Sequence, residues 1–451
     1  MSFRFGDLPT ELIYKIFSYL NSTDLARSCM VSKRWRSIGN SDTLWKHLCE
    51  LDDIHEEYID SKNIPSEGVG CLDPLCKWAF VYSDFLLTLT RNWMNQTCSE
   101  IIISNSVLQV MFNKIWMFQA LRSHTMSVDI FQLKDKVFQK LQSIKISDKN
   151  YGINCLYAVQ DSLFISFNNI IVIYEYINGR FQYEKAIAVT ETTINQDVNS
   201  LDTFIKQFHS YTCYIVKITL VKKYVWISSD ICVLVIDRDT SVLQRKIMIN
   251  GSSVLFFSTE KQFNLVSLDT VTSYSANATI LQSTYISQRG KGSISFTSKY
   301  FGFIDEDHFT PVVVNLLTGC VNVLKIPNSY SLTLNKKLPY VYILNLVDNT
   351  FSLNAMAIPS GDYLWSKTVD IPVQKKTSFM LYTILNKYLL LFYLSNKNHN
   401  FAIYSLASGK HLCTWENEQP FYPVNNIMLK YPNMSTFGTM LGIDKKIKCL
   451  L

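Results

Sequence analysis

The sequence has few of the residues that carry catalysis or bind metals. Histidine occurs only seven times in 451 residues, and no histidine lies at a metal-type or nucleophile-type spacing from Cys, Asp or Glu. The eleven cysteines include no CxxC pair, so we interpret them as buried, reduced thiols. We therefore expect no catalytic residue, no metal site and no cofactor, and we expect the chain not to be an enzyme.

Charge of one sign and long hydrophobic runs are also scarce. The net charge is +6 and no long run of Lys or Arg appears, which argues against nucleic-acid binding. The longest apolar run, residues 389–394, is far too short to span a membrane, and the first residues have no apolar signal-peptide core. We expect a cytoplasmic or nuclear protein that binds neither nucleic acid nor membrane.

Glycine is scarce as well, with 15 residues, whereas the chain has 25 Tyr, 27 Phe and 8 Trp. Aromatic residues favour strands over glycine-rich turns. Hydrophobic residues make up 48% of the chain and charged residues 18%, which excludes extended disorder. A chain of 451 residues exceeds what one compact core usually holds, so we expect two domains.

Apolar residues at helical spacing open the chain. The first predicted helix, from Pro9 to Leu20, carries two apolar stripes: Leu8, Leu12, Ile16 and Leu20 on one, and Ile13 and Phe17 on the other. Shorter helices should follow, with apolar faces at Leu25, Ala26, Cys29 and Met30, then at Trp35 and Ile38, and then, after a cap at Ser41, at Leu44, Trp45 and Leu48. So small a bundle needs only one stripe of the first helix, so the other is available to a partner.

Residues 5–49, FGDLPTELIYKIFSYLNSTDLARSCMVSKRWRSIGNSDTLWKHLC, resemble an F-box along their whole length. The expected residue types stand at Leu8-Pro9, Leu12, Ile16, Leu20, Leu25, Val31-Ser32, Trp35-Arg36 and Leu44-Trp45. The resemblance implies that a Skp-type adaptor, which joins the receptor to a cullin and RING ligase core, is bound by Leu8, Pro9, Leu12, Ile16, Leu20 and Leu25. The alternative is that these residues only hold a small helical bundle together.

A polar, acidic connector at residues 52–70 precedes a further predicted helix, which starts at Asp73-Pro74 and carries apolar residues as far as Trp93. Its end, Arg91-Asn92-Trp93, is similar to the junction of F-box/WD-repeat receptors, although Met94 stands where that family commonly has Gly. This helix is either a stiff junction or an ordinary amphipathic helix packed under the second domain, and the two readings are compatible.

From residue 100 onward, short apolar runs separated by turn signals predict strands. The clearest strand–turn–strand units have their turns at Gly319, Gly361 and Gly409. Weaker copies lie near Lys136, Gly179, Thr240 and Ala278. Most of their separations are near the roughly 40–50 residues of a four-stranded propeller blade. The longest separation contains a polar stretch, residues 190–210, which we interpret as a loop insertion.

The tail, residues 425–451, offers about three more strands, and the strand near residues 101–103 would complete their sheet and close a ring. The predicted organisation is an F-box at 1–50, a connector and linker helix at 51–98, and an all-β propeller at 99–451, with eight blades or alternatively seven. The WD-repeat resemblance is weaker than the F-box resemblance because the Gly-His and Trp-Asp signatures are essentially missing. A pair of β-sandwiches is the alternative fold.

These features predict the substrate-recognition subunit of an SCF-type ubiquitin ligase, in which the propeller binds the protein to be ubiquitinated. If that substrate carries a phosphate, Lys222, Lys223, Arg238 and Arg289 are candidates to bind it. The acidic cluster at residues 305–308 is explained by an exposed loop without a ligand. Two alternatives stay open: an F-box scaffold without a role in ubiquitination, and a propeller that is an enzyme or binds a small ligand.

Overall fold

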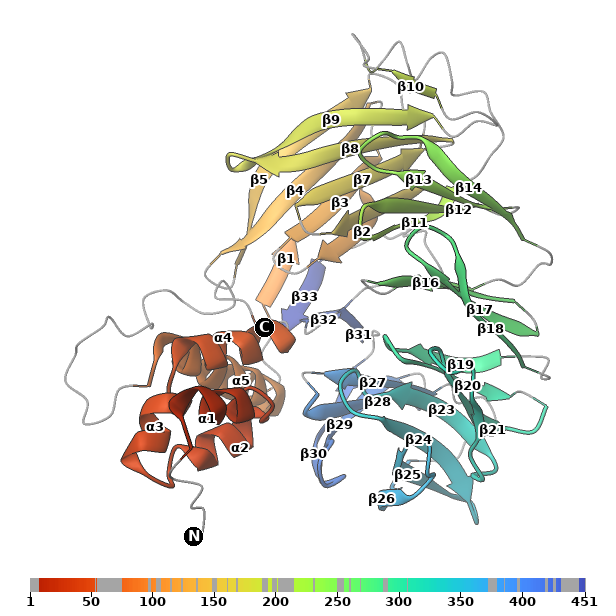
Figure 1. Cartoon of the computed structure of the whole chain (residues 1–451). Helices are drawn as coiled ribbons and strands as arrows, with labels where there is room; N and C mark the ends of the chain where they lie inside the picture. Colours follow the sequence, from red (N-terminus) through yellow and green to blue (C-terminus); the bar gives the residue numbers. More distant parts are fainter. Residues whose placement is uncertain are drawn as a thin grey trace.

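A computed structural model describes residues 8–52, 54, 75–95, 99–102, 107–113, 116–122, 125–134, 137–147, 152–159, 161–167, 169–188, 194–196, 201, 215–229, 232–249, 255–258, 261–267, 269–286, 291–305, 307–371, 379–384, 386–395, 398–417, 421–424, 427–430 and 446–450. Within these ranges a helical module at the N-terminal end packs against a large all-β domain (Figure 1). None of the described helices is long and apolar enough to span a membrane.

The described part of the helical module contains five helices: α1 (Thr10–Phe17), α2 (Ser22–Ser28), α3 (Lys33–Gly39), α4 (Asp42–Leu51) and α5 (Lys77–Asn95). Side-chain oxygens of Asn21, Ser32 and Ser41 accept hydrogen bonds from backbone N–H groups in the first turns of α2, α3 and α4. Such caps satisfy donors that a helix start leaves without an intrahelical partner. The predicted helices are confirmed, although α1 ends earlier than expected and the predicted start of the linker helix at Asp73-Pro74 lies outside the described residues.

The described strands form eight antiparallel sheets, numbered here in chain order. Sheet 1 contains β2 (Val107–Asn113), β3 (Trp116–Arg122), β4 (Met126–Lys134) and β5 (Val137–Ser147). Sheet 2 contains β6 (Cys155–Val159), β7 (Ser162–Phe167), β8 (Ile170–Ile177), β9 (Arg180–Ala188) and β10 (Ile194–Gln196). Sheet 3 contains β11 (Ile215–Val221), β12 (Tyr224–Ser229), β13 (Cys232–Asp237) and β14 (Leu243–Met248). Sheet 4 contains β15 (Leu255–Ser258), β16 (Gln262–Val266), β17 (Thr270–Ser275) and β18 (Ile280–Tyr285).

The remaining sheets have the same up-and-down order except the last. Sheet 5 contains β19 (Lys291–Phe296), β20 (Tyr300–Asp305), β21 (Thr310–Asn315) and β22 (Val321–Val323). Sheet 6 contains β23 (Ser329–Leu334), β24 (Tyr340–Val347), β25 (Thr350–Ala357) and β26 (Tyr363–Val369). Sheet 7 contains β27 (Phe379–Ile384), β28 (Tyr388–Ser395), β29 (Asn398–Ser405) and β30 (His411–Asn417). Sheet 8 contains β31 (Phe421–Val424), β32 (Ile427–Lys430), β33 (Lys446–Leu450) and β1 (Ser99–Ile102).

Sheet 8 joins the two ends of the β domain. Its order is β1-β33-β32-β31, and Ile101 lies opposite Ile447 in the β1–β33 pair. The predicted closure of the tail by the strand near residues 101–103 is thereby confirmed, although one strand of this sheet, β31, precedes the predicted tail at 425–451. Pairing the first strand with the last sheet covers an edge that would otherwise expose unpaired backbone groups.

The seven predicted strand–turn–strand units coincide with the third and fourth strands of sheets 1–7, and the turn itself is confirmed in six of them. Gly179, Gly319, Gly361 and Gly409 have φ between 65° and 81° there, a conformation that glycine adopts without strain. The turn near Lys136 lies outside the described residues. The stretch 190–210 is described only at 194–196 and 201, and β10 adds a fifth strand to sheet 2, so the insertion is not loop throughout.

The sheets follow one another in chain order around the β domain (Figure 1). The first strand of one sheet contacts the first strand of the next in the pairs β2–β6, β6–β11, β11–β15, β19–β23 and β23–β27. First strands gathered on the inside of a radial array are the organisation of a β-propeller, whereas a sandwich stacks two sheets face to face. The propeller prediction is supported over the pair of β-sandwiches.

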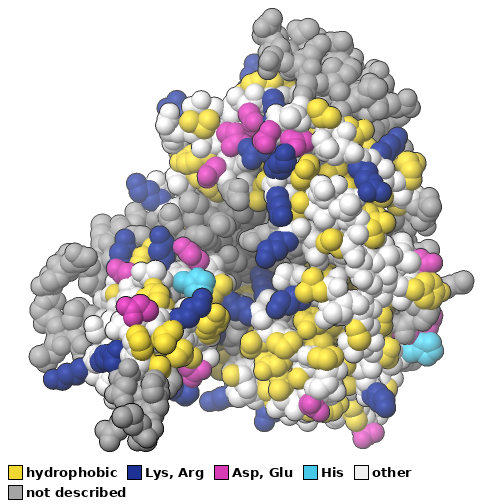
Figure 2. Space-filling view, in the orientation of Figure 1, with side chains coloured by type: hydrophobic (Ala, Val, Ile, Leu, Met, Phe, Trp, Pro, Cys, Tyr) yellow, Lys and Arg dark blue, Asp and Glu magenta, His cyan; other side chains and the backbone are white. Residues whose placement is uncertain are grey.

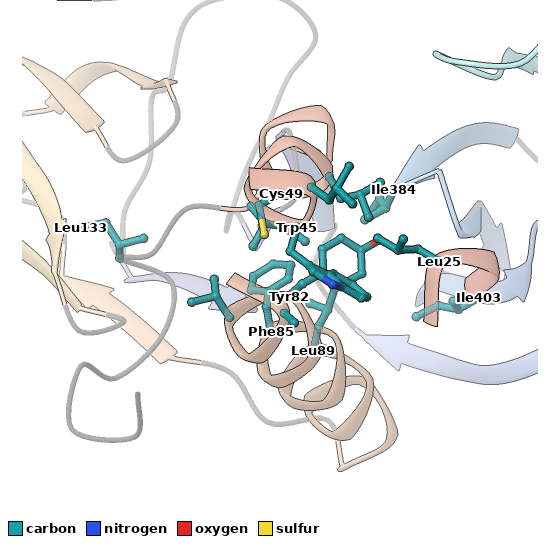
Figure 3. Close-up of a cluster of buried hydrophobic side chains, with 14 of the residues drawn as sticks. Leu25, Trp45, Cys49, Tyr82, Phe85, Leu89, Leu133, Ile384 and Ile403 are labelled. Atoms are coloured by element: carbon teal, nitrogen blue, oxygen red, sulfur yellow. The ribbon is translucent and has the colours of Figure 1, made fainter. Parts of the chain in front are cut away.

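The helical module shares a hydrophobic core with the β domain, which Figure 3 shows from close range. Trp45, Tyr82 and Phe85 pack in one buried cluster with side chains of sheets 1 and 7 such as Leu133 and Ile403. The linker helix α5 is therefore both the junction and an amphipathic helix packed on the second domain. Burial of large apolar side chains stabilises the junction because it removes them from water.

Candidate functional site

The helix α1 leaves part of its apolar surface exposed. Ile13 and Phe17 are buried in the core, whereas Leu12 is 51% exposed and Ile16 is 37% exposed. Single exposed apolar side chains are common on proteins, but two on successive turns of one helix make a continuous ridge. The sequence-based expectation of a second, unused apolar stripe is confirmed at Leu12 and Ile16.

The other predicted adaptor contacts have different environments. Pro9 is exposed at the start of α1, and Leu8 and Leu20 are half-buried against the core of the module. Leu25 is completely buried in the folded chain, and its contact with an adaptor stays a prediction. The short helix α2 buries only Ser22 and Leu25, and Leu25 lies beside Gly39.

Three large apolar residues in the turns between α1, α2 and α3 are exposed and were not predicted as contacts. Tyr19 is 76% exposed, Met30 is 73% exposed and Val31 is 64% exposed. Met30 was assigned to the buried face of α2, but α2 ends at Ser28 and Met30 lies in the turn after it. The spacing of Tyr19, three residues after Ile16, was the signal that could have placed it beside the ridge. Figure 2 shows apolar side chains gathered on the outer surface of the module.

We call Pro9, Leu12, Ile16 and Tyr19, which lie at helical spacing along α1 and the turns at its ends, the apolar ridge. Arg34, on α3, fixes the start of α1 beside it, because its Nη2 donates to the carbonyl oxygen of Leu8 at 2.6 Å. Trp35 packs edge-on against Phe17, with ring centroids 5.4 Å apart, on the buried side of the same helix. These contacts hold α1 in one orientation, so the ridge is presented by a fixed framework.

A buried polar cluster fixes the module to the β domain. Asp52, at the end of α4, is 6% exposed and accepts hydrogen bonds from Tyr82 Oη at 2.6 Å and from Lys337 Nζ at 2.5 Å. Asn386 Nδ2 donates to the same carboxylate at 3.4 Å. The carboxylate therefore joins α4, α5 and the turns that precede β24 and β28.

Lys387 adds a second cation to this cluster. Its Nζ lies 4.9 Å from the ring centroid of Tyr82. Burial lowers the pKa of Lys387, with Asp52 opposing this change and Lys337 adding to it. Burial and the neighbouring Asp52 carboxylate raise the pKa of the Tyr82 hydroxyl, which keeps it protonated as a donor. The cluster joins the domains through charge as well as apolar packing.

Three of the predicted phosphate-binding candidates lie together: Lys222 and Lys223 share the turn before β12, and the backbone N–H of Arg238 donates to the carbonyl oxygen of Lys223 at 2.9 Å. Lys223 forms an ion pair with Asp237 at 2.8 Å, and Arg238 forms one with Glu175. Lys222 is exposed, and Arg289 lies outside the described residues. In the acidic cluster, Asp305 Oδ2 lies 2.6 Å from His308 Nδ1, and the described part of the chain contains no group of residues arranged to hold a metal ion.

The sequence of the helical module is similar to those of known proteins. Residues 5–51 match the family model for F-box-like domains. This segment is an F-box-like domain. It is 42% identical over 43 residues to the probable E3 ubiquitin ligase complex SCF subunit sconB of Aspergillus niger, and 44% identical over 43 residues to that of Penicillium rubens. Each match covers 10% of this chain and 6% of the relative, so it concerns the F-box-like domain alone.

The β domain is similar in structure to several solved proteins of low sequence identity. BamB from Moraxella catarrhalis is 11% identical and aligns with 78% of this chain and 95% of its own, with a TM-score of 0.44. Saccharomyces cerevisiae Sqt1 is 9% identical and aligns with 74% of this chain and 95% of its own, with a TM-score of 0.46.

Proposed function

We propose that the chain is the substrate-recognition subunit of an SCF-type ubiquitin ligase. The F-box-like domain docks a Skp-type adaptor, and through it a cullin and RING core, while the β-propeller binds the protein to be ubiquitinated. The eight sheets are the blades of that propeller. The chain itself catalyses no step, and it works in the cytoplasm or the nucleus.

The observation that carries this proposal is the exposure of Leu12 and Ile16 on an F-box-like helix. Covering a large aliphatic side chain completely contributes roughly 1.5–3 kcal/mol, so a partner that buries both gains substantially. Tyr19 extends the apolar ridge, Met30 is a further exposed apolar side chain of the same domain, and aromatic and flexible side chains of this kind are favoured at protein interfaces.

The junction between the domains supports a receptor role. Asp52 and the core around Tyr82 hold the F-box-like domain against sheets 6 and 7, so a protein bound to the propeller keeps one position relative to the adaptor. A ligase of this kind acts by raising the effective concentration of substrate lysines near the transferring subunit. A fixed junction limits the geometries that the bound substrate can sample.

Co-purification of the full chain with a tagged Skp-type adaptor tests the docking step. Leu12→Ala with Ile16→Ala removes the centre of the apolar ridge and is expected to abolish capture of the adaptor. The matched control, Ile280→Ala with Leu281→Ala, truncates two side chains of similar exposure, 58% and 55%, on the propeller strand β18 and leaves capture unchanged. A folded ridge variant that still captures the adaptor contradicts the proposal.

A second experiment distinguishes the receptor role from that of a scaffold that binds the adaptor without directing ubiquitination. Proteins that co-purify with the full chain under proteasome inhibition are compared with those retained by the folded Leu12→Ala, Ile16→Ala variant. Proteins retained by both are candidate substrates of the propeller. Ubiquitin on these proteins that depends on the intact ridge supports the receptor role, and its absence supports the scaffold.

A further inference from the structure

Lysine recurs at one position of the propeller. The turn between the first and second strands carries Lys222 and Lys223 in sheet 3, Lys261 in sheet 4, Lys299 in sheet 5, Lys336 and Lys337 in sheet 6, and Lys387 in sheet 7. We call these the lysine turns. Lys222, Lys261, Lys299 and Lys336 are exposed. These four lysines belong neither to the apolar ridge nor to the apolar core of the junction.

Contacts between neighbouring sheets place the lysine turns on one face. Ser293 of β19 accepts from Leu332 N, and Ser295 accepts from Leu334 N, so β19 and β23 run side by side in the same direction. Lys299 and Lys336, which follow the ends of these strands, therefore lie on the same side. This is the face on which the helical module packs, because Lys337 contacts Asp52.

Sheets 3, 4 and 7 have the same orientation. Arg245, near the start of β14 in sheet 3, donates to the carbonyl oxygen of Ala278, which lies in the turn between β17 and β18 of sheet 4. Trp365, near the start of β26 in sheet 6, donates to the carbonyl oxygen of Leu406, which lies in the turn between β29 and β30 of sheet 7. A Cβ on Gly319, in the turn before β22 of sheet 5, would clash with Nε2 of Gln282, near the start of β18 in sheet 4. Turns after the first and third strands of an up-and-down sheet lie at the same end of the sheet, so these contacts align the lysine turns too. Figure 2 shows a column of Lys and Arg side chains on the β domain beside the helical module.

In two of the lysine turns, a lysine forms an ion pair with a carboxylate of this chain. Lys337 binds Asp52 at 2.5 Å, and Lys223 binds Asp237 at 2.8 Å. Lys223 donates a hydrogen bond that lowers the pKa of Asp237. Exposed Lys222, Lys261 and Lys299 continue the positive charge along sheets 3–5, away from the junction. Positive charges gathered on one surface attract an anion with spacing to match.

We infer that the lysine turns form a docking surface for an acidic, Asp- and Glu-rich segment of a partner protein. Carboxylates of the segment would bind lysine ammonium groups of the neighbouring sheets, as the Asp52 carboxylate binds Lys337. The segment lies on the face beside the F-box-like domain, so its owner is held next to whatever the apolar ridge binds. The inference goes beyond the adaptor-docking function and does not depend on it.

The test measures binding of a fluorescent peptide of alternating Asp and Glu to the full chain by anisotropy. Lys222→Glu, Lys261→Glu and Lys299→Glu are combined because these residues lie outside the Asp52 junction. The control combines Lys246→Glu, Lys325→Glu and Lys367→Glu, three exposed lysines outside these turns, with the same change in net charge. Exposed charge pairs contribute roughly two- to threefold each, so the lysine-turn variant should bind at least roughly tenfold more weakly than the control.

The outcomes separate this inference from the adaptor proposal. Both triple variants should still capture the Skp-type adaptor, which also verifies that they are folded. Equal loss of peptide binding in the two variants would mean that only net charge matters, and the inference would be wrong. The same holds if the wild-type chain does not bind the peptide, or if an oligonucleotide of equal charge binds more tightly through the same lysines.

Discussion

Asp52 and Lys337 are 285 residues apart in the sequence, yet the Asp52 carboxylate accepts a hydrogen bond from Lys337 Nζ at 2.5 Å. This contact ties the last helix of the F-box-like domain to the turn before β24. Because Asp52 is buried and also accepts from Tyr82, the F-box-like domain and the propeller share polar as well as apolar contacts.

Removal of this carboxylate should loosen the junction. Asp52→Ala leaves Lys337 and Lys387 facing each other without the anion that compensates them. Loss of one partner of a buried ion pair costs about 3–5 kcal/mol, and we expect about 2 kcal/mol because Lys337 is 31% exposed. Chemical denaturation measures the change. Arg27→Ala, which breaks the exposed pair with Asp24, is the control and should change stability by less than about 0.5 kcal/mol.

The Tyr82 hydroxyl should make the fold sensitive to alkaline pH. Its pKa is raised in the folded protein by burial and by Asp52, from the ordinary value of 10.0. Above pH 10 the unfolded chain loses this proton and the folded chain keeps it, so stability falls as pH rises, by up to about 1.4 kcal/mol per pH unit. Denaturation midpoints in this range should fall less steeply for Tyr82→Phe than for the wild type. Equal slopes for both proteins would contradict this prediction.

Leu25 and Leu12 should separate structure from binding. Leu25→Ala empties a completely buried position and should destabilise the F-box-like domain by about 2–4 kcal/mol. Leu12→Ala shortens a side chain that is 51% exposed and should change stability by less than about 1 kcal/mol. Denaturation combined with adaptor capture checks both. A stable Leu25→Ala protein would contradict the burial of this residue, and a strongly destabilised Leu12→Ala protein would contradict the exposure of the ridge.

The turn glycines should differ in how well they tolerate a methyl group. Gly409 and Gly179 both have positive φ, at 65° and 81°, so alanine costs about 1–2 kcal/mol at either position. A Cβ at Gly409 would also lie 2.7 Å from Cε3 of Trp365, whereas a Cβ at Gly179 meets nothing within 4 Å. Gly409→Ala should therefore be less stable than Gly179→Ala by a further 1–3 kcal/mol or so. Equal thermal stability of the two variants would show that sheets 6 and 7 do not pack this closely.

Local pattern was sufficient for much of the fold. The stripes of α1 follow from helical spacing, and the turn glycines at 319, 361 and 409 mark hairpins because that conformation favours glycine. The closing strand near residue 101 followed from counting strands in the tail. The complete burial of Leu25 could not be predicted from the pattern of α2 alone, because it depends on neighbours from other helices, here Gly39.

The sequence by itself determined the order of a helical module and repeated hairpins, and the presence of one more apolar stripe than a small bundle can bury. Only the tertiary structure decided which side chains form the apolar ridge, that Asp52 meets Lys337, and that the lysine turns share one face. The physical reason is distance along the chain. Periodicity records local geometry, whereas exposure and charge pairing arise from residues brought together from hundreds of positions apart.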